Sequence, residues 1–130
     1  MGRVSFNSTA KSIFLRLKVG SINTDMTRDI LVALDTGASI SIIPTEVATD
    51  LGSDLSNPNE QMMTANGIVL ANRITVPKLT AIGETVGNID VVCHDLPDGS
   101  IIEGLLGLNF LRHFDVNISF STGTIELHRR

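Results

Sequence analysis

Hydrophobic residues recur at every second position along much of this chain, and this period constrains the fold more than any other feature. Between residues 13 and 19, Ile, Leu, Leu and Val occupy the odd positions, and between residues 114 and 120, Phe, Val, Ile and Phe occupy the even ones. Successive side chains of a β-strand point to opposite faces, so this alternation is typical of half-buried strands. The clearest helical signal is the segment after Pro44, which favours a short helix. The sequence therefore predicts an all-β protein with many short strands and one or two short helices.

Length and composition are those of a single globular domain. We expect one domain over residues 1–130, with a flexible N-terminal segment over residues 1–11. Hydrophobic residues make up 42% of the chain and charged residues 18%, a balance that excludes a disordered protein. The net charge is −4 and the basic residues are scattered, so we expect neither nucleic acid nor membrane as a partner. We expect a cytoplasmic protein, or a domain of a longer chain that is targeted elsewhere.

One carboxylate interrupts the most hydrophobic part of the sequence. In "ILVALDTGASISIIP", residues 30–44, Asp35 is the only charged residue. An ordinary turn at the end of a strand would also bring Asp, Thr and Gly together. However, apolar residues resume directly after Gly37, which predicts that the segment is interior on both sides. An unpaired carboxylate is expensive to bury, so the pattern favours a hydrogen-bonded or proton-sharing role for Asp35.

Three stretches occur in a fixed order along the chain. Leu31 to Ser39 reads hydrophobic-hydrophobic-Asp-Thr-Gly-Ala-Ser, Thr64 to Ile74 contains an Asn-Gly hairpin turn, and Leu105 to Leu111 reads Leu-Leu-Gly-x-Asn-Phe-Leu. Together they resemble the retropepsin-like aspartic proteases, and more closely the cellular and bacterial (A2-like) members than the viral ones. The resemblance covers roughly residues 12–127. It implies the acid protease fold, a closed, orthogonal β-barrel with one or two short helices.

The resemblance also implies a set of site residues. Asp35, Thr36 and Gly37 would form the catalytic loop, in which Thr36 holds the loop of a partner chain and Gly37 lets the substrate backbone approach. Ser39 and Leu108 stand where viral members carry charged residues, so the edge of the site is expected to be less polar. No metal or cofactor is implied. The residues implied to contact a peptide or protein substrate are Ala38, Ser39, Ala65, Asn66, Gly67, Ile68 and Leu106.

The number of catalytic motifs then predicts an oligomeric state. The chain has no second Asp-Thr-Gly or Asp-Ser-Gly, and Asp98 lies in a polar turn. A site built from two aspartates therefore needs two copies of Asp35, and hence a symmetric homodimer. The resemblance implies that Phe114 to Phe120 and Ile125 to Leu127 form the interface, although these strands could instead close the sheet of the single chain. The predicted function is that of an aspartic endopeptidase; the alternative is a catalytically silent domain for dimerisation or peptide binding.

Other reactive side chains fit structural roles better. Cys93 and His94 are adjacent on an expected strand, so they point to opposite faces and cannot form a catalytic pair. We expect Cys93 to be buried and structural. Ser39 lies two residues after Gly37, but Ser41 stands where the Gly-x-Ser-x-Gly motif of a hydrolase nucleophile needs its second glycine. Met62 and Met63 could line a substrate groove, or they could fill a gap in the core.

Overall fold

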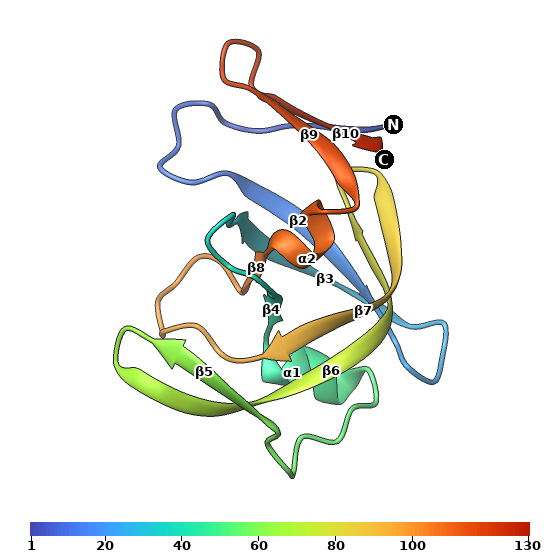
Figure 1. Ribbon diagram of the computed structural model, residues 1–130, viewed down its shortest axis with the longest axis vertical. Coiled ribbons are helices and arrows are strands. Elements are labelled where there is room, and N and C mark those ends of the chain that lie inside the picture. The colour runs from blue at the N-terminus through green and yellow to red at the C-terminus, as the bar shows by residue number, and fades with distance from the viewer.

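The computed structural model describes residues 1–130, which form ten strands and two short helices (Figure 1). The strands are β1 (Gly2–Ser5), β2 (Phe14–Gly20), β3 (Thr27–Leu34), β4 (Ser41–Ile43), β5 (Glu60–Thr64), β6 (Gly67–Ala81), β7 (Glu84–Cys93), β8 (Gly104–Leu106), β9 (Phe114–Ser119) and β10 (Thr124–Arg129). The helices are α1 (Thr45–Asp50) and α2 (Leu108–Leu111). The predicted all-β fold with short helices is confirmed. Neither helix has the length and hydrophobicity that a membrane-spanning helix requires.

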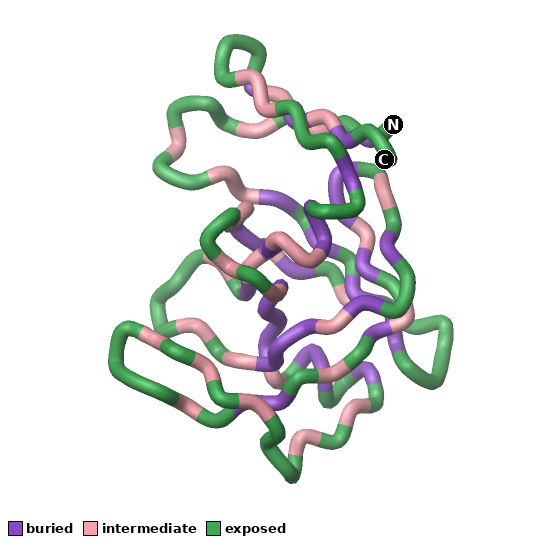
Figure 2. Tube along the Cα trace, viewed as in Figure 1, coloured by how far each residue is buried: buried purple, intermediate pink, exposed green.

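Six strands form a closed barrel in the order β2-β3-β8-β4-β7-β6, and pairing between β6 and β2 closes it. β8 lies between two strands that precede it by many residues: it runs parallel to β3 and antiparallel to β4. Side chains from all six barrel strands and from α1 and α2 fill the interior, which appears as the purple segments at the centre of Figure 2. This core is largely aliphatic, with Phe110 and Phe114 as its buried aromatic members. Burial of these apolar side chains stabilises the barrel.

A second sheet of three strands, in the order β1-β10-β9, lies at one end of the barrel (top of Figure 1). The expectation of a flexible segment over residues 1–11 is wrong for Gly2–Ser5, because these residues pair with β10 as an edge strand. β10 has a neighbour on both sides, and its Ile125 and Leu127 are fully buried in the core of the same chain. β9 and β1 are the two edges of this sheet.

Two hairpins extend the barrel wall. The predicted hairpin of β5 and β6 is confirmed, but its two-residue turn is one position earlier than the predicted Asn-Gly. The turn consists of Ala65 and Asn66, and Gly67 follows it with φ of 111°. The hairpin of β6 and β7 turns at Ile82 and Gly83, with φ values of 55° and 73°. A β-branched residue seldom adopts positive φ, but Ile82 is buried in the core, and this burial offsets the strain.

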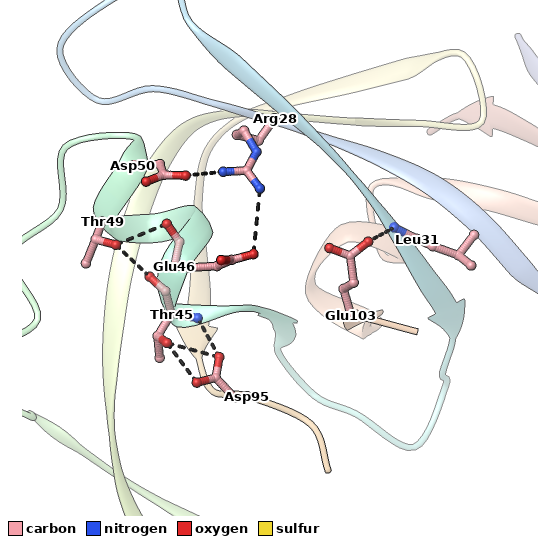
Figure 3. A network of polar contacts seen from close by, with 8 residues as sticks. All are labelled: Arg28, Leu31, Thr45, Glu46, Thr49, Asp50, Asp95 and Glu103. Atoms are coloured by element: carbon pink, nitrogen blue, oxygen red, sulfur yellow. Dashed lines mark hydrogen bonds and ion pairs between the residues drawn. The ribbon is translucent and has the colours of Figure 1, made fainter. Parts of the chain in front are cut away.

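Polar contacts fix α1 and the loop before β8 (Figure 3). The Asp95 carboxylate accepts hydrogen bonds from the Thr45 backbone N–H at 2.9 Å and from its hydroxyl at 2.8 Å, so a side chain from a distant loop caps the start of α1. At the entry to β8, the Glu103 N–H donates to the Leu31 carbonyl at 2.7 Å, and the Glu103 carboxylate accepts from the Leu31 N–H at 3.2 Å. These contacts hold β8 against β3.

Candidate active site

Asp35 directly follows β3, on a turn that leads into β4. Its N–H donates to the Leu106 carbonyl on β8 at 3.0 Å, which extends the β3–β8 pairing up to the aspartate. The Gly37 N–H donates to Asp35 Oδ1 at 2.8 Å, and the Ala38 N–H donates to the Asp35 carbonyl at 3.2 Å. The side chain is half-buried rather than fully interior, and Oδ2 has no hydrogen-bond partner within the chain. The turn therefore fixes one carboxylate oxygen and leaves the other free to act on a ligand.

The segment that follows β8 supports this turn. The Leu108 N–H donates to the Ala38 carbonyl at 2.8 Å, and the Asn109 N–H donates to the Ser39 carbonyl at 3.1 Å. This contact requires Gly107, because a Cβ atom there would lie 2.7 Å from the Ala38 carbonyl oxygen. Gly104 permits an equally close approach of β8 to β4, where a Cβ would lie 2.1 Å from a backbone oxygen. The two glycines that flank Leu105 and Leu106 are thus explained by close backbone packing.

A buried polar network joins the same two segments. Ser41 is fully buried; its hydroxyl donates to Asn109 Oδ1 at 3.0 Å and accepts from the Gly107 N–H at 2.9 Å. Asn109 Oδ1 also accepts from the Ser41 N–H at 2.9 Å, and its amide nitrogen donates to the Asp90 carbonyl. Neither Ser41 nor Asn109 is among the site residues predicted from the sequence. Their signal was that each is a polar residue within an apolar run that must satisfy its hydrogen bonds internally.

A cavity of about 470 Å³ opens beside Asp35. The turn after β3 forms one side of it, and β5 of the β5–β6 hairpin forms the other. Glu60 is the only other carboxylate in its lining, and Arg73 lies 3.7 Å from that carboxylate in an ion pair. The remaining surface is mostly apolar, so the cavity suits a ligand with apolar side chains. The lining residues are Asp35, Gly37, Ala38, Ser39, Ile40, Ile42, Glu60, Gln61, Met62, Met63, Val92 and Leu105.

Comparison with known proteins identifies this arrangement. The family described as "gag-polyprotein putative aspartyl protease" matches residues 19–113, which is most of the chain and includes both the Asp35 turn and β8. The chain belongs to this family. A retropepsin-like aspartic protease from Rickettsia conorii has a similar structure, with a TM-score of 0.69 and 28% sequence identity over 96% of this chain and 87% of that one. No curated protein sequence matches the chain. The retropepsin-like fold expected from the sequence is confirmed.

Within this retropepsin-like domain, only some of the predicted site residues lie together. Asp35, Gly37, Ala38 and Ser39 lie together in the cavity lining. The predicted contacts at the hairpin tip, Ala65, Asn66, Gly67 and Ile68, do not line the cavity. The hairpin contributes residues 60–63 to the lining instead. Both methionines therefore border the cavity, and Met62 also packs against the small cluster of Ile42, Ala71 and Val92.

One predicted substrate contact is wrong. Leu106 is fully buried in the barrel core, whereas its neighbour Leu105 lines the cavity. Adjacent residues of β8 face opposite sides of the sheet, so only one of the two leucines can reach a ligand. The pattern Leu-Leu-Gly does not reveal which one it is.

Cys93, at the end of β7, is structural as predicted. The thiol is buried, and burial together with the nearby Asp95 carboxylate raises its pKa to about 11. A thiol with this pKa is protonated at neutral pH and is a poor nucleophile.

Thr36 faces a different hollow from Asp35. It is exposed at the tip of the turn and borders a mostly apolar groove of about 400 Å³, which runs along α2 and β9. Arg112 and Arg130 are the charged residues in the lining of this groove. The apolar residues are Leu34, Leu108, Leu111, Phe114, Val116 and Ile118.

Proposed function

We propose that this retropepsin-like domain is an aspartic endopeptidase that is active as a homodimer, with one Asp35 from each chain. The observation that carries the proposal is that the chain has one such aspartate, on a rigid turn, with one oxygen held by the Gly37 N–H and the other free. The second carboxylate of the cavity, Glu60, does not follow a comparable motif, and its only ion pair is an exposed one with Arg73 at 3.7 Å. A second Asp35 therefore has to come from another copy of the chain.

The paired carboxylates would hydrolyse a peptide by acid and base catalysis. Two carboxyl groups close together cannot both ionise at low cost, and those of aspartic proteases share one proton in this way. The ionised Asp35 takes a proton from water as the water oxygen attacks the peptide carbonyl, and the protonated Asp35 gives its proton to the carbonyl oxygen. Collapse of the resulting diol breaks the C–N bond as the proton held by the base passes to the leaving nitrogen. A diol hydroxyl returns a proton to the other Asp35, which leaves a carboxylic acid product and restores the single shared proton.

The groove beside Thr36 supports the choice of a second copy as the partner. β9 is an edge strand of the β1-β10-β9 sheet, and its apolar residues Val116 and Ile118 are incompletely buried. A free strand edge next to apolar side chains is a surface that a symmetric partner can cover. Because this surface continues into Thr36, a partner bound there would bring its own turn towards Asp35. Of the two interface strands implied by the sequence, we retain β9, since β10 is already paired on both sides.

The β5–β6 hairpin would act as a flap over the substrate. Its exposed side chains Met63 and Ile68 face each other across the two strands, and closure over a bound peptide would remove apolar surface from water. The peptide would bind in an extended form, with apolar residues beside the bond that is cut, because the lining around Asp35 is apolar. The tip residues Ala65 to Ile68 would make their contacts only in the closed state.

The chemistry is tested by a cleavage assay on a diverse peptide mixture, with and without pepstatin. Asp35→Asn should abolish cleavage without lowering the melting temperature. Asp98→Asn, a matched change in an exposed turn, should leave the rate unaltered. Full activity of the Asp35→Asn protein would refute the mechanism. A wild-type protein that cuts no peptide would favour the silent peptide-binding alternative.

The dimer is tested by mixing active and inactive chains. If each site needs two Asp35 residues, an equal mixture of wild-type and Asp35→Asn chains should retain about a quarter of the activity of the same total amount of wild-type protein. Independent monomers would retain about half. Sedimentation of the wild type over a range of concentrations gives the dissociation constant of the dimer, and the mixing comparison is made at concentrations above it.

A further inference from the structure

A second strand edge lies open on the barrel, away from Asp35. Along one side of β2, β6 pairs only with residues 18–19, so no strand covers the first half of β2 on that side. The Ile13 carbonyl accepts the Leu34 N–H from the β3 side. Because backbone groups alternate in direction along a strand, the N–H and C=O groups of Phe14 and Arg16 point away from β3. They form an unpaired edge.

β1 presents a second unpaired edge. The Phe6 N–H donates to the Gly123 carbonyl at 2.8 Å, in register with the pairing of β1 and β10. The same alternation then directs the backbone groups of Arg3 and Ser5 away from β10. β1 is the outermost strand of its sheet, so no other strand bonds to these groups.

Both edges border one cavity of about 390 Å³, which we name the β1–β2 slot. Residues Arg3 to Ser5 line it from β1, Phe14 to Arg16 and Lys18 line it from β2, and the Ile82–Gly83 turn closes one part. None of its lining residues belongs to the cavity beside Asp35. Proteins commonly cover or block exposed strand edges, because such edges pair readily with another extended chain.

The charge of the slot differs from that of the whole protein. The chain carries a net charge of −4, yet the slot is lined by the cations Arg3, Arg16 and Lys18 and by one carboxylate, Asp29. Arg16 and Lys18 make no ion pair, and Arg3 contacts Glu126 only at 3.7 Å near the surface. An exposed pair of this kind contributes little and separates readily. The slot is therefore a local cationic site with free backbone donors and acceptors.

We propose that the β1–β2 slot binds an extended, acidic segment of a protein partner, which adds as a strand between β1 and β2. Backbone groups of Arg3, Ser5, Phe14 and Arg16 supply the hydrogen bonds of strand addition, as in other β-augmentation sites. The arginine and lysine side chains select acidic residues at alternate positions of the segment. Binding joins the small sheet to the barrel wall and is independent of the chemistry at Asp35.

The proposal is tested by fluorescence polarisation with a short labelled peptide that alternates valine and glutamate, added to the Asp35→Asn protein so that no cleavage occurs. Reversal of two of the three slot cations, Arg16→Glu with Lys18→Glu, should weaken binding roughly tenfold or more. The matched control reverses two exposed lysines outside the slot, Lys11→Glu with Lys78→Glu, and should leave the affinity nearly unchanged. Equal losses in the two double variants would overturn the proposal.

Strand addition is distinguished from simple attraction of an anion by two further measurements. Hydrogen exchange of the Arg16 amide should slow when the peptide binds, and Ser5→Pro, which removes a slot-facing N–H but no bond to β10, should weaken binding. A peptide of equal charge with proline at alternate positions should not bind. Equal binding of the proline-containing peptide, or of an oligonucleotide, would overturn the proposal. So would a charge-reversal variant that changes its oligomeric state but keeps the affinity for the valine–glutamate peptide.

Discussion

Replacement of Ser41 by alanine tests whether the buried network supports the Asp35 turn. The substitution removes two buried hydrogen bonds, of 3.0 Å to Asn109 Oδ1 and 2.9 Å from the Gly107 N–H. Asn109 Oδ1 retains the Ser41 N–H at 2.9 Å, but the Gly107 N–H is left without a partner. An unsatisfied buried donor costs about 1–3 kcal/mol, and the second lost bond about 1 kcal/mol. We expect the free energy of unfolding to fall by about 2–4 kcal/mol.

Chemical denaturation provides the measurement, with the midpoint and slope determined together. For a domain of this size, the expected loss corresponds to a melting temperature lower by roughly 7–15 °C. Ser39→Ala is the matched control, because Ser39 lies two residues earlier, is exposed and makes no side-chain hydrogen bond; its effect should stay within about 0.5 kcal/mol. If Ser41→Ala were as mild as Ser39→Ala, the network would not be what holds the turn.

Three further predictions concern packing and titration. Gly104→Ala places a Cβ 2.1 Å from a backbone oxygen on β4 and should lower the free energy of unfolding by roughly 3 kcal/mol. In the control variant Gly87→Ala, the new Cβ meets its nearest atom at 3.5 Å, so the same denaturation experiment should show a change of less than about 0.5 kcal/mol. Burial raises the pKa of the Cys93 thiol from 9.0 to about 11, so the thiol ionises at lower pH in the unfolded chain than in the folded one. The free energy of unfolding should therefore decline as pH rises through this interval. A Cys93→Val variant with the same decline would show that Cys93 is not its cause. A hydrogen bond from the Thr75 hydroxyl, and a smaller contribution from Arg73, lower the pKa of Asp90 below 3.8. The ionised Asp90 therefore stabilises the fold, and this stabilisation is lost as pH falls through the lowered pKa. Thr75→Val should raise the pKa of Asp90 in an NMR titration and move acid unfolding to higher pH.

The strands and the position of Asp35 could be predicted because their signals are local. Alternation of apolar and polar residues is a property of each strand alone, and a single carboxylate in an apolar run is visible without any partner. The choice between Leu105 and Leu106 could not be predicted in this way. Both are leucines on one short strand, and only the neighbours of β8 decide which faces the core. The same holds for Ile125 and Leu127, whose burial depends on the barrel beneath β10.

Other features escaped prediction because tertiary contacts override local preferences. Ile82 occupies a turn position that favours Gly or Asn, and it does so because its side chain is buried in the core. Gly2–Ser5 has too few residues to show a period, yet it forms a strand because β10 offers it an edge. Ser41 and Asn109 lie far apart in the sequence, and their shared network exists only once β4 and α2 meet.

The insertion of β8 between β3 and β4 has a consequence for how the chain folds during synthesis. β3 and β4 are complete within the first 43 residues, but the strand that joins them does not leave the ribosome until Gly104–Leu106 has been made. Until then the nascent barrel is an open sheet with two exposed edges, and such intermediates aggregate readily. Pairing across so large a sequence separation also slows the search for the native state. A chaperone that shields the nascent β3 and β4 edges should therefore raise the yield of folded protein more than one that acts after release.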